Sequence, residues 1–408
     1  MSLRFENTLY IFQIHCIGVP VALSDAVYSD MTRARRLLEE SSIDAIVVAW
    51  PENVGYVSGF YHPDLHLTWE RLHVVVWASG HEPVFVVPRP REQNWMANTS
   101  QPWGPDDQRP HIDDIRGFDG EHAAAMHVIG DALEEHGITA GTVGVEFRSA
   151  PYRIVRGLQK RFPKLTFADA WPLLNEMRKI KTAAEVELIT SINQLTAQAM
   201  GKVLSTVEPG ETERSVASRL THTLLDAGAD ELSHTVFGGD CRGGQWHPWP
   251  SERLLEKGDV LRADWGIRKN GYRSDIARTT VVGTANAHQR DHFSRILEVF
   301  DIVVDSVCPG VVASEIFQLA KKNYERLGLE FRWPIVGHGI GLVLHEEPHL
   351  TPEYDDPIVE GMLLEIELGW VDENVGYHYE DLVHVGPSGA TCLTGQPGTW
   401  RLIESGTR

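Results

Sequence analysis

Residues 259–282 read DVLRADWGIRKNGYRSDIARTTVV, and this stretch predicts a β-hairpin with two aspartates on one face. The Asn-Gly pair at 270–271 lies between two strand-like runs, which is a strong signal for a two-residue hairpin turn. With that turn, Asp264 stands opposite Ala277, and Asp275 points to the same side because it is two residues from Ala277. The two aspartates are then diagonal neighbours, with β-carbons somewhat under about 7–8 Å apart. That spacing suits two metal ions held about 3.5–4 Å apart between the carboxylates.

A second hairpin pairs two glutamates. The strand-like runs at 363–370 and 376–385 flank a turn at 371–375, which places Glu367 directly opposite Glu380. Like charges that face each other in apolar strands destabilise a sheet unless something neutralises them, and a cation would do so. A single acid on a strand usually lies on a solvated outer face, so neither hairpin is decisive alone. Two hairpins with paired acids together favour a metal site.

Residues 337–349 (GHGIGLVLHEEPH) lie between the two hairpins and add His338 and His345. The last five of these residues match the H-E-x-x-H pattern of zinc proteases, which works only on a helix, where positions i and i+4 share one face. Pro348 and the preceding glycines oppose a helix, so we reject a zinc site of that kind. Four carboxylates together with His338 instead make a hard, oxygen-rich site for two ions. Such a site can polarise a carbonyl and hold a bridging hydroxide.

The composition restricts the classes of partner. A net charge of -20 argues against nucleic acid or an anionic membrane as the main partner. No apolar run reaches transmembrane length, and the four cysteines form no C-x-x-C pair. The only candidate signal peptide, at 9–23, is interrupted by polar residues and a proline. We therefore expect a cytoplasmic protein without a disulfide framework.

The 408 residues suggest two or three domains, and the pattern of segments changes near residue 172. Before that point helix-like and strand-like segments alternate, as in the helical spacing at 31–42 and the buried-type strand at 44–50. This alternation is typical of an α/β domain. After that point two long helical patterns, at 183–207 and 211–228, precede strands with glycine-rich connections.

These residues resemble the pita-bread metallopeptidase family, which includes prolidase, aminopeptidase P, methionine aminopeptidase and the metal-free relative creatinase. The matching stretches are ADWGIRKNGYRSDIART, GHGIGLVLHEEP, GMLLEIELG and GYHYEDLV. They look like the family's two-aspartate hairpin, its histidine segment and its two glutamate strands. The resemblance spans nearly the whole chain and is strongest to Xaa-Pro dipeptidase-like members. It implies a creatinase/prolidase-like α/β N-terminal domain at 1–172 and an α+β pita-bread catalytic domain at 173–408.

Carried over residue by residue, the resemblance implies two divalent ions, either Mn, Co, Fe or Zn, and a set of five ligands. The five are Asp264, Asp275, His338, Glu367 and Glu380. Asp275 and Glu380 would bridge both ions, and Glu367 would also be the general base that takes a proton from the bridging water. Glu208 lies in a literal copy of the family's T-x-E-P-G ligand motif, but between two helical segments, and we interpret it as an exposed connection residue.

Two more histidines receive roles from the same resemblance. His345 would hydrogen-bond the scissile group or the developing oxyanion. His247, seventeen positions before Asp264, would bind substrate near the leaving side. The resemblance also implies a homodimer, in which the stretch at 61–73 is a candidate for reaching the neighbour's site.

Four positions depart from the family pattern. Glu365 stands where the family usually has threonine, Leu368 where it has proline, and Ala277 where threonine is common. His378 stands where proline-releasing members usually have arginine, whose bidentate grip on a substrate carboxylate an imidazole does not reproduce. We therefore expect Glu365 and His378 to join the two catalytic histidines in the substrate-binding shell.

These departures leave more than one function open. The first hypothesis is a dinuclear-metal hydrolase of the prolidase or aminopeptidase P type, which cleaves an Xaa-Pro or similar N-terminal peptide bond by a metal-bridging hydroxide. The alternative is a metal-dependent hydrolase of a non-peptide C–N bond in a small metabolite, as in creatinase and ectoine hydrolase. A third reading, a non-catalytic binding module, is opposed by the complete ligand set. The expected partner is a small peptide or a small-molecule amide.

Overall fold

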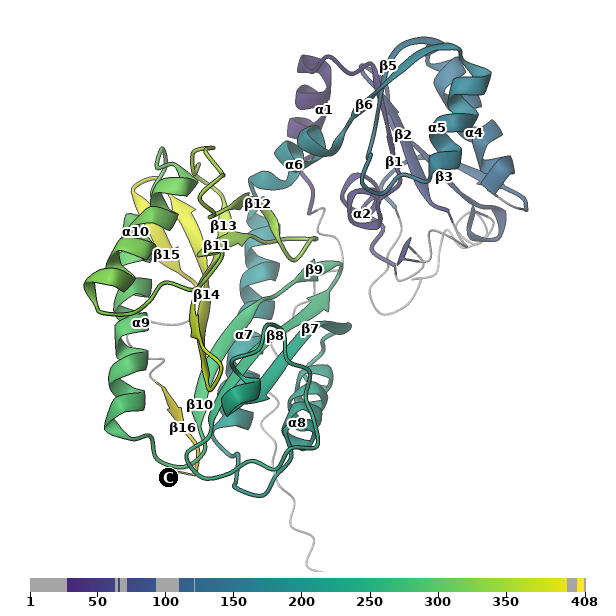
Figure 1. The fold of residues 1–408 in the computed structure, drawn as a ribbon. Helices are drawn as coiled ribbons and strands as arrows, with labels where there is room; N and C mark the ends of the chain where they lie inside the picture. The colour runs from purple at the N-terminus through teal and green to yellow at the C-terminus, as the bar shows by residue number, and fades with distance from the viewer. Residues whose placement is uncertain are drawn as a thin grey trace, which may run out of the picture.

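The structure, a computed structural model, describes residues 28–62, 65–66, 72–92, 110–120, 122–394 and 402–406. The candidate signal segment at 9–23 lies outside these residues, and the stretch at 61–73 lies partly outside them. The described chain forms a smaller N-terminal lobe and a larger C-terminal lobe (Figure 1).

The N-terminal lobe is built on a six-stranded mixed sheet with the strand order β4-β3-β2-β1-β5-β6. Its strands are β1 (Ala45–Val48), β2 (Val74–Ala78), β3 (Val84–Pro88), β4 (Asp114–Phe118), β5 (Ala140–Val145) and β6 (Lys164–Asp169). Its helices are α1 (Met31–Glu40), α2 (Pro51–Ser58), α4 (His122–Glu135), α5 (Tyr152–Arg161) and α6 (Trp171–Lys179). The helix expected at 31–42 and the strand expected at 44–50 are both present, and the expected α/β class is confirmed.

Both faces of this sheet are buried, which explains its continuous apolar strands. Ile46 and Val48 belong to a core shared with helices α1, α2 and α6, whereas Ala45 and Val47 pack into a second core beneath α4 and α5. Alternate residues of one strand therefore serve opposite layers, as the two-residue period of a strand requires.

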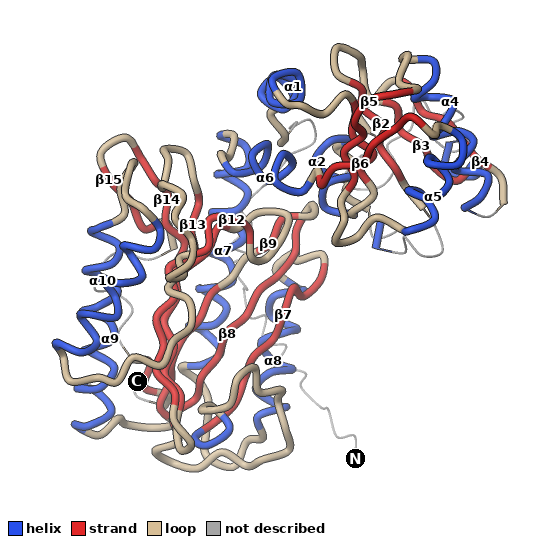
Figure 2. Tube along the Cα trace, turned by 45° about the horizontal axis from the view of Figure 1, so that its top comes forward, coloured by secondary structure: helices blue, strands red, loops and turns tan. Residues whose placement is uncertain are grey.

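The C-terminal lobe holds two five-stranded sheets between two layers of helices, as Figures 1 and 2 show. The first sheet contains β7 (Glu231–Gly239), β8 (Val260–Lys269), β9 (Tyr272–Arg273), β10 (Ile276–Val281) and β16 (Ile403–Glu404). The second contains β11 (Gly337–Gly339), β12 (Glu346–His349), β13 (Leu363–Val371), β14 (Gly376–Gly386) and β15 (Gly389–Cys392). The helices are α7 (Ala183–Leu204) and α8 (Glu213–Asp226) against the first sheet, and α9 (Ala287–Ser306) with α10 (Ala313–Arg326) on the side of the second. No helix among the described residues is both long enough and apolar enough to cross a bilayer.

The two hairpins have the registers that the sequence predicts. Asp264 is opposite Ala277, and Glu367 is opposite Glu380. Asn270 and Gly271 both have positive φ angles, 49° and 83°, as a tight hairpin turn between right-twisted strands requires. The last four residues of the H-E-x-x-H segment form the strand β12 and not a helix, which confirms the rejection of a helical zinc site.

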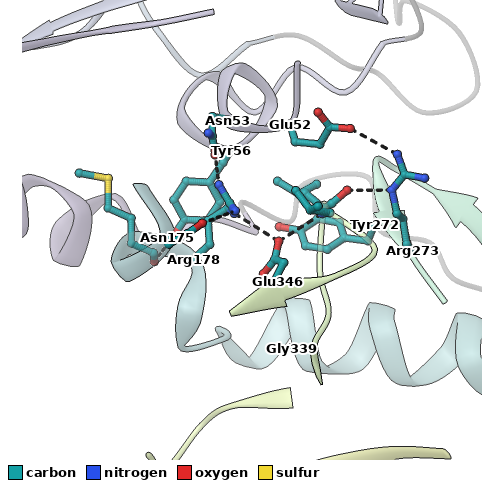
Figure 3. Close-up of polar contacts among 12 residues, drawn as sticks. Glu52, Asn53, Tyr56, Asn175, Arg178, Tyr272, Arg273, Gly339 and Glu346 are labelled. Atoms are coloured by element: carbon teal, nitrogen blue, oxygen red, sulfur yellow. Dashed lines mark hydrogen bonds and ion pairs between the residues drawn. The ribbon is translucent and has the colours of Figure 1, made fainter. Parts of the chain in front are cut away.

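A buried ion-pair cluster joins the two lobes beside β12 (Figure 3). Glu346 accepts from Arg178 of α6, with Nε and Oε1 3.2 Å apart, and from Lys181, with Nζ and Oε2 2.8 Å apart. Arg178 also donates to Asn53 of α2. Since His345 directly precedes Glu346, the N-terminal lobe holds in place the strand that follows a candidate catalytic histidine.

Candidate metal centre

The five predicted ligands converge where the two sheets of the C-terminal lobe meet. Asp264 lies on β8 and Asp275 directly before β10, whereas His338, Glu367 and Glu380 come from β11, β13 and β14. Nε2 of His338 is 3.7 Å from Asp275 Oδ2, 3.8 Å from Glu367 Oε1 and 3.7 Å from Glu380 Oε1. One imidazole nitrogen therefore faces three carboxylates from both sheets.

His338 has the orientation of a metal-binding histidine. Its Nδ1 is 3.0 Å from the carbonyl oxygen of Gly339, which leaves the lone pair of Nε2 directed toward the carboxylates. The side chain is buried, and Nε2 has no hydrogen-bond partner among the described residues. Burial and the nearby His345 lower the pKa of His338 and so favour the neutral ring, which is the form that binds metals. These features fit a divalent ion at this place.

The carboxylates carry more negative charge than their surroundings neutralise. Burial, followed by the charges of Asp275 and Glu367, raises the pKa of Glu380 well above its usual range. Burial opposes ionisation of Asp264 too, but His234 and His378 hold the pKa of that carboxyl below its usual range. Divalent cations would supply the missing positive charge, because hard oxygen ligands bind them directly.

His234 is the residue that sequence reasoning missed. It lies on β7, and its Nε2 is 2.8 Å from Asp264 Oδ1 and 3.1 Å from Asp275 Oδ1. Burial alone would lower the pKa of His234, but the carboxylates of Asp275 and Asp264 outweigh it and raise that pKa to about 10. The sequence feature that could have identified His234 is the polar run Ser-His-Thr at 233–235, in a strand that pairs with the strand of Asp264.

Glu365 and His378, expected in the substrate-binding shell, lie buried among the candidate ligands. His378 Nε2 is 3.3 Å from Glu367 Oε2, and its Nδ1 is 3.8 Å from Asp264 Oδ2. Neither carboxylate oxygen of Glu365 has a hydrogen-bond partner within the described parts of the chain, and burial with the charge of Asp275 raises the pKa of Glu365 well above its usual range. Contact of these two side chains with substrate stays a prediction.

The other two predicted histidines are exposed. The ring of His345 is 4.2 Å from the ring of His338, so it lies at the open side of the carboxylate cluster. His247 lies on the loop between β7 and β8 with a left-handed backbone, φ 49°, and makes no hydrogen bond with a described residue. Its neighbour Trp246 packs on Trp333, with ring centroids 5.3 Å apart. Glu208 is exposed after α7, as expected.

An aromatic side chain orients one of the carboxylates. Trp333 donates from Nε1 to Glu367 Oε2 at 3.2 Å, and its ring packs on His378 with centroids 4.6 Å apart. Gly369 provides the room, because a β-carbon there would be 2.4 Å from the Trp333 ring. The guanidinium of Arg262 lies over the same indole, 5.9 Å from the ring centroid.

Known proteins share this architecture. Residues 187–387 match the metallopeptidase family M24, and residues 31–180 match the creatinase/prolidase N-terminal domain. The Xaa-Pro dipeptidase of Pyrococcus furiosus is 26% identical over 363 residues, which are 88% of this chain and 95% of that protein.

Two solved structures are similar along almost their whole length. The prolidase from Pyrococcus horikoshii has 25% identity and a TM-score of 0.75, with 90% of this chain and 99% of that one covered. The dipeptidase PepE from Mycobacterium ulcerans has 25% identity and a TM-score of 0.77, with 91% and 96% covered. The chain therefore belongs to metallopeptidase family M24, and it is a hydrolase with a creatinase/prolidase-type N-terminal domain and a pita-bread catalytic domain.

Proposed function

We propose that this metallopeptidase is an Xaa-Pro dipeptidase that uses two divalent ions held by Asp264, Asp275, His338, Glu367 and Glu380. The observation that carries the proposal is the position of His338 Nε2, buried without a hydrogen-bond partner and facing three carboxylates at 3.7–3.8 Å. The substrate class is supported by the names of similar proteins, an Xaa-Pro dipeptidase, a prolidase and a dipeptidase.

The ions, when bound, would supply Lewis acidity and lower the pKa of an attacking water. Glu367 accepts the proton of that water. Its carboxylate is oriented for this task by the indole N–H of Trp333 at 3.2 Å and by His378 at 3.3 Å. Replacing the side chain of Trp333 or of His378 would leave the Glu367 carboxylate less well oriented as a base.

His345 and His247 act on the substrate side. His345 is exposed beside His338 and donates a hydrogen bond to the oxygen of the scissile carbonyl, where negative charge develops. His247 and Trp246 lie on an exposed loop next to Trp333, and this loop contacts the leaving side of the peptide, the proline. An aromatic surface suits the apolar face of a proline ring. We further propose that the enzyme is a cytoplasmic homodimer.

Hydrolysis of a substrate panel tests the proposal. The metal-reconstituted protein is offered Xaa-Pro dipeptides, the corresponding Xaa-Pro amides, Xaa-Pro-Yaa tripeptides, and guanidino and acylamino acids. We expect release of proline from the dipeptides to be the fastest reaction. Cleavage of the non-peptide compounds without any proline release would refute the proposal in favour of a small-metabolite hydrolase.

A further inference from the structure

The imidazole of His234 is packed against the carboxylates in a space that the backbone provides. On the paired strands β7 and β8, His234 is opposite Gly266, and Asp264 lies two residues from Gly266 on the same face. A β-carbon at position 266 would be 2.5 Å from Cε1 and 2.6 Å from Nδ1 of His234. The missing side chain at 266 thus leaves room for the ring beside β8, from where it reaches the aspartates.

The ring of His234 hydrogen-bonds Asp264, and its distances to both aspartates also match those between two ligands of one ion. Metal–nitrogen and metal–oxygen bonds of about 2.0–2.2 Å place neighbouring donor atoms about 2.8–3.1 Å apart around a six-coordinate ion and about 3.3–3.6 Å apart around a four-coordinate one. Nε2 of His234 is 2.8 Å from Asp264 Oδ1 and 3.1 Å from Asp275 Oδ1. Only a small outward shift of each group would admit an ion between the three atoms.

We propose that His234 is a metal ligand, so that each ion of the pair has its own imidazole. One subsite is His234, Asp264 and Asp275, and the other is His338, Glu367 and Glu380. Within each group the potential ligand atoms lie within 4.8 Å of one another. This proposal rests on the metal centre of the proposed function but not on its substrate.

The extra nitrogen alters which ions the first subsite prefers. A subsite of carboxylates alone suits hard ions such as manganese and magnesium, whereas imidazole suits zinc, iron and nickel. His234 therefore shifts this subsite toward the second group. A histidine that only hydrogen-bonded Asp264 would not enter the ligand field of the ion, and this difference separates the two roles experimentally.

A matched pair of variants tests the assignment. His234→Gln removes the proposed ligand. His378→Gln removes another buried histidine that contacts the proposed ligands without joining them, 3.3 Å from Glu367 and 3.8 Å from Asp264, and so measures the effect of a histidine outside the ligand set. Each chelator-treated protein is titrated with zinc and with cobalt. Bound metal is counted after equilibrium dialysis, and the visible absorption of the cobalt form is recorded.

We expect the wild-type chain to bind two ions and His234→Gln to lose more than about 100-fold in affinity for one of them, with an altered cobalt spectrum. Retained binding of one ion by the other subsite shows that the variant is folded. If His234→Gln binds no ion, His234→Phe is measured as a second variant. A loss no larger than that of His378→Gln, with an unchanged spectrum, would overturn the assignment of His234. Absence of metal binding by the wild-type chain would instead refute the metal centre itself.

Discussion

Glu367 of β13 and Glu380 of β14 are direct cross-strand partners, and both side chains are buried. Burial raises the pKa of Glu380, and the charges of Asp275 and Glu367 add to this effect. Two ionised carboxylates in this position repel each other, so this pair destabilises the metal-free fold. The same repulsion makes bound cations a source of stability.

Replacement of one partner separates these two effects. We expect Glu380→Gln to unfold at a higher temperature than the wild type in a chelating buffer at pH 7, because the repulsion is removed. Added manganese stabilises the wild type by about 3 kcal/mol at a concentration 100 times the dissociation constant, and so raises its unfolding temperature. We expect a smaller rise for the variant. Thermal unfolding with and without manganese gives both values. An equal gain for both proteins would contradict a ligand role for Glu380.

The ion-pair cluster between the lobes predicts a strong effect on stability. Glu346→Gln leaves Arg178 and Lys181 with unpaired charges in a buried place, and we expect the free energy of unfolding to fall by about 3–5 kcal/mol. Glu353→Gln on the exposed loop after β12 is the control, with an expected change within about 0.5 kcal/mol. Urea denaturation of the three proteins measures these differences. Equal stability of Glu346→Gln and the control would show that the cluster does not hold the lobes together.

Glu185 of α7 predicts a pH dependence. Burial, partly offset by Lys181 and the backbone N–H of Thr182, raises the pKa of Glu185 from 4.5 to about 7. The folded protein thus holds this proton more tightly than the unfolded chain, so ionisation destabilises the fold increasingly as pH rises from 4.5 to 7. The difference between the two pKa values corresponds to about 3 kcal/mol above pH 7.

Glu185→Gln removes this titration. We expect the free energy of unfolding to decline less between pH 5 and pH 8 in this variant than in the wild type, whatever its stability at a single pH. Glu187→Gln, an exposed residue of the same helix, should retain the wild-type slope. Parallel pH profiles for all three proteins would contradict the raised pKa.

Arg262 is a buried cation beside Trp333 whose charge acts on Asp264, and we expect it to take the role of the arginine that the family usually has at position 378. It lies on β8 two residues before Asp264, and its Nε and Nη1 have no hydrogen-bond partner among the described residues. We expect Arg262→Met to raise KM about tenfold or more for an Xaa-Pro dipeptide and to leave KM for the Xaa-Pro amide unchanged, because a charge-assisted hydrogen bond contributes about 1.5–3 kcal/mol. Steady-state kinetics on the two substrates gives the comparison. Equal effects on both would exclude a contact with the free carboxylate.

Much of the site could be predicted because short turns determine the registers of its two hairpins. Asn270 and Gly271 adopt the left-handed conformations that their residue types favour, so the positions of Asp264 and Asp275 follow from counting. The glutamate pair follows in the same way from its turn, which in the structure is the four residues 372–375 because Val371 already pairs with Gly376.

His234 could not be placed by counting. The loop between β7 and β8 is long, and the pairing of these strands is irregular between Leu232 and His234, so no local turn determines the register. The ion pairs of Glu346 could not be predicted for a similar reason. Its partners Arg178 and Lys181 are 168 and 165 residues away in the chain, and only tertiary packing brings them together.

Proline release from an Xaa-Pro dipeptide, followed while manganese is added back to the chelated protein, tests the central claim most directly. We expect no release before metal is added, a rise that follows the amount of bound metal, and no activity in Asp275→Asn at any metal concentration. Proline release by the chelated protein, or by the metal-loaded Asp275→Asn variant at the wild-type rate, would contradict a metal-dependent dipeptidase at this site.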